Sequence, residues 1–89
     1  MAKRRSRIRE AVNRVLYSRD PGRYVILYRH RRPDGSETLA EIDPRWIERV
    51  DQWAVHLAMG ETIPLHRIVE IRDRSGRLIW RRGGEWLEK

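Results

Sequence analysis

The chain has 89 residues, enough for one domain with one modest core, and this length excludes a second domain. The absence of cysteine excludes disulfides and thiol chemistry, and no apolar run approaches the roughly 18 residues that a membrane-spanning helix needs. The formal charge of +7, with 18 arginines among 20 basic residues, indicates an acidic partner or a heat-adapted surface.

A helix is expected over residues 5–18. Ile8, Val12, Val15 and Leu16 follow the i, i+4, i+7, i+8 spacing that places apolar side chains on one helical face. The turn at residues 20–22 ends this helix, because proline lacks an amide hydrogen and glycine adopts turn conformations. The basic residues 1–4 are expected to be a flexible start.

Two β-hairpins are expected next. In the first, residues 24–28 and 38–42 flank the turn chemistry of Pro33-Asp34-Gly35-Ser36. In the second, residues 69–72 and 77–81 flank Asp73-Arg74-Ser75-Gly76. Residues 83–89 are interpreted as a polar tail.

Residues 43–60 leave two interpretations open. Trp46, Ile47, Val50 and Trp53 have helical spacing, with Asp43 as N-cap, so periodicity favours a helix. Residues 53, 55 and 57 also alternate, which is the pattern of a strand. The chain is therefore expected to be a single α+β domain over residues 1–89, with an N-terminal helix packed on a small antiparallel, hairpin-rich sheet or half barrel.

A more specific signal is the stretch Ile63-Pro64-Leu65-His66-Arg67-Ile68, followed by Gly76 and Ile79-Trp80-Arg81. These residues resemble the signature of the RNA cyclic group end recognition family, which is best known from archaea. Residues 12–17 resemble that family's leading helix, and His30-Arg31 resembles its His-Arg-Gly element, although Arg32 stands where the family tends to have glycine.

The resemblance implies a small α+β fold and binding to RNA ends that carry 2′,3′-cyclic or terminal phosphates. The expected partners are single-stranded RNA ends and RNA-processing proteins, in the cytoplasm. No cofactor or metal is expected, and the chain is not expected to be an enzyme by itself. In many relatives of this family, the region equivalent to residues 53–57 looks like a strand, which weighs against the helix.

His66 and Arg67 are the first candidate site, because Pro64 fixes the local backbone while imidazole and guanidinium supply donors for phosphate oxygens. In a regular strand these two side chains would point to opposite faces, so one shared ligand requires a bend or bulge. The alternative is a buried histidine that holds the turn through backbone hydrogen bonds.

The end of the first strand is the second candidate site. Alternation places Arg29 and Arg31 on one face, and Tyr28 and His30 on the other. One face would clamp a phosphate backbone, whereas the alternative is a solvated hairpin tip.

Trp80, Arg81 and Tyr28 are candidates for stacking and neutralising single-stranded nucleotides. The alternative is core packing, which is favoured more strongly for Trp46 and Trp53. The complete set of predicted RNA-binding or phosphate-binding residues is His66, Arg67, Arg31, His30, Arg29, Trp80, Arg81, Tyr28 and Arg14.

Three other functions compete with RNA-end binding. A phosphodiesterase could use His30 and His66 as an acid and base pair, but the sequence has no paired His-x-Thr motif and no phosphate loop. A protein-interaction module could use the apolar sheet or the Trp86-Leu87 tail. A nonspecific duplex binder would depend steeply on salt and be indifferent to the RNA end.

Overall fold

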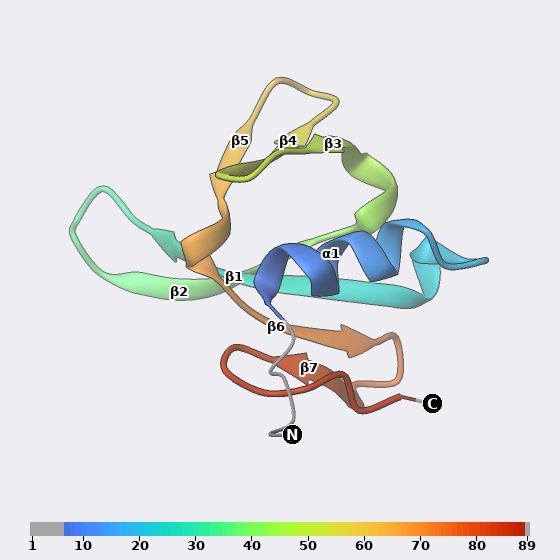
Figure 1. Cartoon of the computed structure of the whole chain (residues 1–89). Coiled ribbons are helices and arrows are strands. Elements are labelled where there is room, and N and C mark those ends of the chain that lie inside the picture. The colour runs from blue at the N-terminus through green and yellow to red at the C-terminus, as the bar shows by residue number, and fades with distance from the viewer. Residues whose placement is uncertain (1–6, 89) are drawn as a thin grey trace.

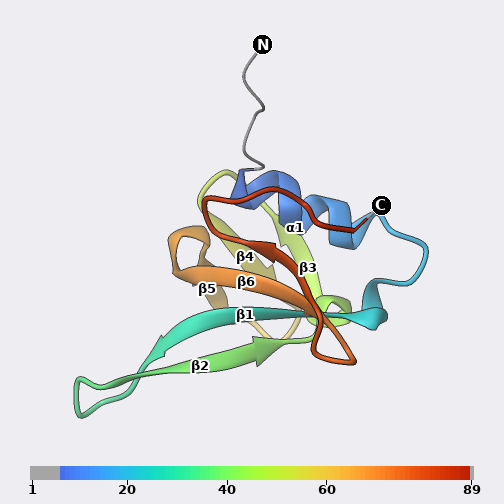
Figure 2. The same ribbon diagram turned by 90° about the horizontal axis from the view of Figure 1, so that it is seen from below.

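The computed structural model describes residues 7–88, with one α-helix, α1 (Ile8–Leu16), followed by seven strands and three short 3-10 helices. The strands form two antiparallel sheets, and α1 covers one side of the core between them (Figures 1 and 2). The α+β prediction is confirmed, and the sheets do not close into a barrel. Within residues 7–88, no helix has the length and apolarity to cross a membrane.

The larger sheet has four strands in the order β2 (Glu37–Ile42), β1 (Tyr24–Arg31), β6 (Ile68–Asp73) and β7 (Leu78–Arg81). The smaller sheet has the order β3 (Ile47–Val50), β4 (Ala54–Leu57) and β5 (Thr62–Pro64). The 3-10 helices are η1 (Pro21–Arg23), η2 (Pro44–Trp46) and η3 (Leu65–Arg67), the last of which leads from the smaller sheet into β6.

Helix α1 begins at Ile8 and ends at Leu16, within the predicted range of 5–18, although residues 5 and 6 lie outside the described residues. Its buried side chains are Ala11, Val12 and Val15, which lie on the predicted apolar face. The hydroxyl of Ser18 donates to the carbonyl of Val15 at 2.6 Å, and the Ser18 amide donates to the same carbonyl at 3.2 Å, so Ser18 closes the end of the helix.

The region of residues 43–60 is extended, so the helix interpretation is wrong and the strand interpretation is correct. Asp43 does act as a cap, since its Oδ1 accepts from the Arg45 amide at 2.9 Å, but it begins only the single turn of η2. Asp51 then accepts from the amides of Trp53 at 2.7 Å and Ala54 at 2.8 Å. These two hydrogen bonds stabilise the turn between β3 and β4, and they use amides that a helix would pair with backbone carbonyls.

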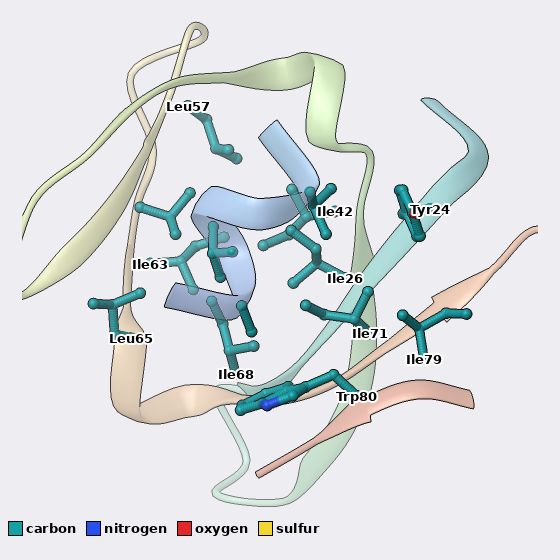
Figure 3. Close-up of a cluster of buried hydrophobic side chains, with 14 residues drawn as sticks. Tyr24, Ile26, Ile42, Leu57, Ile63, Leu65, Ile68, Ile71, Ile79 and Trp80 are labelled. Carbon is teal, nitrogen blue, oxygen red and sulfur yellow. The ribbon is translucent and has the colours of Figure 1, made fainter. Parts of the chain in front are cut away.

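The core consists mainly of aliphatic side chains from both sheets and α1 (Figure 3). Trp80 belongs to it and is only 1% exposed, whereas Trp46 is 47% and Trp53 is 74% exposed. The expectation that Trp46 and Trp53 pack in the core is therefore wrong. Six isoleucines and one tryptophan fill the space instead: Ile26, Ile42, Ile63, Ile68, Ile71, Ile79 and Trp80.

The segment after β7 returns along the domain and is held by specific contacts. The Leu87 amide donates to the Ile79 carbonyl at 2.8 Å. The Trp86 ring lies edge-on to Tyr24, with centroids 5.8 Å apart, and packs against the core. Residues 83–88, predicted as a tail, thus extend the packed part of the domain.

Candidate functional site

Strand β1 extends beyond Ile68, the first residue of its antiparallel neighbour β6. It pairs with β6 from Tyr24 to Tyr28, with a register shift after Leu27, but pairs with β2 as far as Arg31. The β1–β2 hairpin therefore projects from the body of the domain (Figures 1 and 2). Residues 29–31 pair with β2 on one edge, but among residues 7–88 no strand pairs with them on the other edge, where β6 pairs with residues 24–28.

A cavity of about 230 Å³ lies beside this part of β1, and we call it the β1–β5 cavity. Its lining comes from three separate segments, the end of β1, strand β5 with the residue before it, and the end of η3. It brings together five of the nine predicted residues. The lining residues are Tyr28, Arg29, His30, Arg31, Glu61, Thr62, Ile63, Pro64 and Arg67.

The β1–β5 cavity has an excess of positive charge. Glu61 is the one carboxylate among its described lining residues, against three arginines. Neither Arg29 nor Arg67 forms an ion pair within residues 7–88, whereas Arg31 lies 3.9 Å from Glu37. Arg67 instead donates to the carbonyl of Arg29 at 3.4 Å, which holds η3 against the projecting part of β1. The charges of Arg29 and Arg67 remain available to an anion.

Tyr28 and His30 point to the same side of β1, as alternation predicts. Their rings meet edge to face, with centroids 6.2 Å apart and an interplanar angle of 80°. Burial, aided by the negative charge of Glu61, raises the pKa of Tyr28 above its usual value of 10.0. The phenol therefore stays protonated at neutral pH and can donate a hydrogen bond into the cavity.

The turn η3 places the adjacent residues His66 and Arg67 in the linings of two different cavities. Arg67 lines the β1–β5 cavity, whereas His66 is exposed and lines a second cavity of about 540 Å³, which we call the η3–α1 cavity. The alternative of a buried histidine is therefore wrong. A group in the β1–β5 cavity would therefore meet Arg67 and not His66, although the two residues are adjacent in the chain.

Arg82 fixes this turn, and its role was not predicted. Its Nη2 donates to the carbonyls of Leu65 at 3.2 Å and Ile68 at 2.6 Å, and also to that of His66. One guanidinium thus contacts the carbonyls of the first two residues of η3 and of Ile68, the first residue of β6. The sequence shows only two successive arginines here, so no local pattern distinguishes Arg82 from its neighbour.

A hydrogen-bonded chain of side chains supports the smaller sheet, and it was also not predicted. His56 Nε2 lies 2.7 Å from Asp51 Oδ2, and His56 Nδ1 lies 3.3 Å from Thr62 Oγ1. The contact with His56, together with backbone amides, holds the pKa of Asp51 well below its usual value. This chain ties the β3–β4 turn to Thr62, a residue of the β1–β5 cavity lining.

Three other predicted residues lie outside both cavities. Trp80 is buried, so its ring cannot stack on a base and the core-packing alternative is correct. Arg81 is exposed on β7, on the far side of β6 from β1. Arg14 lies over the Trp86 ring at 4.6 Å, where a cation–π contact holds it.

The two histidines proposed as a catalytic pair line different cavities, His30 the β1–β5 cavity and His66 the η3–α1 cavity. An acid and base pair must act on one scissile bond, so this separation gives the pair no support. Among residues 7–88, no cluster of three or more His, Cys, Asp or Glu side chains could hold a metal ion.

The fold and the site define a small, arginine-rich α+β domain with a cationic cavity at a projecting hairpin. The sequence model of the MJ1316 RNA cyclic group end recognition domain matches residues 6–82, and the chain belongs to this family. The family resemblance read from the sequence is thereby confirmed.

Two archaeal relatives cover nearly the same length. The chain is 54% identical to a UPF0248 protein of Aeropyrum pernix, over 99% of this chain and 90% of that protein. It is 38% identical to a UPF0248 protein of Metallosphaera sedula, over 84% of this chain and 91% of that protein. No solved structure matches the chain with statistical significance.

Proposed function

We propose that the protein binds RNA ends that carry a 2′,3′-cyclic or 3′-phosphate, with the terminal phosphate in the β1–β5 cavity. The observation that carries this proposal is that two segments far apart in the chain, β1 with Arg29 and Arg31 and η3 with Arg67, line one cavity. The description of the family, which refers to RNA cyclic group ends, supports the ligand class.

The chemistry of the cavity suits a terminal phosphate. The Arg29 and Arg67 guanidiniums can donate charge-assisted hydrogen bonds to its oxygens without first breaking an ion pair within residues 7–88. The Tyr28 phenol adds a neutral donor, and the His30 ring adds a further polar contact. The volume of about 230 Å³ is below the roughly 300 Å³ at which ordinary ligand pockets begin, so it fits a phosphate and its ribose and leaves the base outside.

The proposed function requires binding and no catalysis. A cyclic phosphate has one negative charge and two free oxygens, and a 3′-phosphate has a further oxygen and more charge. Two arginines that line one cavity can therefore favour either end over a 3′-hydroxyl, which offers no anionic oxygen. RNA-processing proteins are the proposed partners at the rest of the surface.

Fluorescence anisotropy of short single-stranded RNAs tests the proposal. The RNAs differ only in a 2′,3′-cyclic phosphate, 3′-phosphate or 3′-hydroxyl end, and are titrated at two salt concentrations. Wild type is expected to prefer one of the phosphate ends. Arg67→Ala is expected to weaken binding to that end by about tenfold or more and to reduce the preference, because it removes a charge-assisted hydrogen bond.

Arg19→Ala is the matched control, since Arg19 is exposed, lines none of the cavities described and loses the same charge. It is expected to weaken binding to all three ends equally, through the general electrostatic attraction. Equal, salt-sensitive binding of wild type to all three ends would contradict the proposal and identify a generic polyanion binder.

A second candidate, a protein-interaction module, is favoured by one observation. Tyr17 is 86% exposed and lines a cavity of about 450 Å³ together with Leu16 and Val50. An exposed aromatic beside a partly apolar hollow is a common anchor for a protein partner. This candidate would be supported if the chain captures a defined RNA-processing protein, if the interaction survives nuclease treatment, and if Tyr17→Ala abolishes it.

A further inference from the structure

The η3–α1 cavity differs from the β1–β5 cavity in size and in chemistry. Its volume of about 540 Å³ falls within the range of about 300 to 1,000 Å³ that is typical of ligand pockets. It lies between the start of α1, the β3–β4 turn and η3, and its lining includes Arg7, Arg9, Gln52, Trp53 and His66.

Trp53 presents an exposed aromatic face at this cavity. Its side chain is 74% exposed, although burial of an indole is strongly favourable, so its position has no explanation in core packing. Its backbone is nevertheless fixed on both sides, since the amide donates to Asp51 at 2.7 Å and the carbonyl accepts from Leu65 at 2.9 Å. The ring is thus held at the surface by a rigid turn.

The polar groups around Trp53 are those that recognise a nucleotide. Arg7 and Arg9 are exposed cations, and no carboxylate lies among the described residues that line this cavity. The Gln52 amide can both donate to and accept from a base edge, and the His66 ring offers a further polar contact. A small acidic ligand would leave the indole face of Trp53 unused, and a purely aliphatic ligand would leave the polar groups unused.

We infer that the η3–α1 cavity is a nucleobase subsite for single-stranded RNA, in which a base stacks on Trp53 and Arg7 and Arg9 contact the adjoining phosphates. The inference rests on the proposed function, since it places a base close to the terminal phosphate. The two cavities lie on either side of η3, with Arg67 in one and the adjacent His66 in the other. A single-stranded RNA whose terminal phosphate enters the β1–β5 cavity can therefore cross η3, so that a base reaches Trp53.

The test compares Trp53→Ala and Trp53→Phe with wild type on the same three RNAs. Trp53→Ala is expected to weaken binding to every RNA by about 5- to 150-fold, the range that loss of one stacked base gives, while the preference among ends is kept. Trp53→Phe keeps a ring and is expected to retain most of the affinity. Trp46→Ala is the control, because Trp46 is also exposed but lines neither cavity.

The outcomes separate this inference from the proposed function. Unchanged affinity in Trp53→Ala, with end preference intact, would overturn the subsite and leave the proposed function standing. Loss of affinity in Trp53→Ala, with no end preference in wild type, would support the subsite and overturn the proposed function. An equal loss in Trp46→Ala would also overturn the subsite. Circular dichroism confirms that each variant is folded.

Discussion

Individual arginines have different roles in this domain, according to whether a carboxylate neutralises them. Seven of the described arginines form ion pairs: Arg23, Arg31, Arg45, Arg49, Arg72, Arg74 and Arg77. Arg29 and Arg67 have no such partner in the described part of the chain, and both line the β1–β5 cavity. Specific affinity is therefore expected to depend on few of the 18 arginines.

Glu61 is the residue whose removal should strengthen binding. Its carboxylate lines the β1–β5 cavity and would repel a bound phosphate. Glu61→Gln is expected to tighten binding to phosphate-ended RNA by about two- to fivefold, as loss of one exposed like charge allows. The same variant is expected to lower the pKa of Tyr28. Burial would still raise this pKa, but the negative charge of Glu61 would no longer add to it. Anisotropy and a spectrophotometric tyrosine titration measure the two effects, and weaker binding in Glu61→Gln would contradict the assignment.

At the scale of elements, η3 depends on Arg82 for its shape. Arg82→Ala leaves the carbonyls of Leu65, His66 and Ile68 without this donor and is expected to reduce the free energy of unfolding by about 2 kcal/mol. Arg81→Ala, which changes an exposed neighbour, is expected to stay within about 0.5 kcal/mol of wild type. Urea denaturation measures both, and equal stability of the two variants would show that the clamp is unimportant.

The elements differ in how far the sequence predicts them. The leading helix and both long hairpins follow from apolar periodicity and from turn chemistry, which act locally. The sequence of residues 43–60 is ambiguous because Trp46 and Trp53 have helical spacing, although both side chains are exposed to solvent in the structure. The decisive local signal is the Asp51 carboxylate, which caps the turn between two strands of only four residues each. Such a turn cannot be distinguished from a helix on hydrophobic spacing alone.

At the scale of the whole molecule, four aspartates form the same local structure. In each, a carboxylate oxygen accepts from the amide two residues later, which is an Asx turn. Each lies at a point where the chain turns between elements. The four donor amides belong to Ser36, Arg45, Trp53 and Ser75, and the four acceptors are Asp34, Asp43, Asp51 and Asp73.

These turns predict a fold that loses stability in acid. The pKa of each of the four carboxyls is lowered, and for Asp43 the contacts with Arg45 bring it to about 2. A folded-state pKa below the unfolded value of about 3.9 means that the contribution to stability is complete at neutral pH and is lost as pH falls from about 5 towards 2. Urea denaturation at a series of pH values should show this loss.

Asp43→Asn provides the control for that measurement, because the amide keeps an acceptor oxygen but cannot take up a proton. Its unfolding free energy is expected to fall less steeply between pH 4 and 2 than that of wild type. A wild-type stability that stays level over this range would contradict the role given to the Asx turns.

The cavity combines what the sequence predicts with what only the fold provides. Tyr28, Arg29, His30 and Arg31 could be grouped because they are adjacent on one strand, and Arg67 through the family signature. Their approach to one another depends on β6 beginning opposite Tyr28 while β1 continues to Arg31, which is a matter of strand length and register. The roles assigned to Trp53 and Arg82 depend on tertiary position alone, which no local pattern of residues predicts.

Nuclear magnetic resonance titration of the protein with a 2′,3′-cyclic mononucleotide, with the unphosphorylated nucleoside as reference, locates the terminal phosphate directly. The predicted result is a set of backbone amide shifts at residues 28–31, 61–63 and 65–67 that the nucleoside does not cause. Shifts confined to another surface, such as α1 and η2, or identical shifts with both ligands, would contradict a terminal-phosphate site in the β1–β5 cavity.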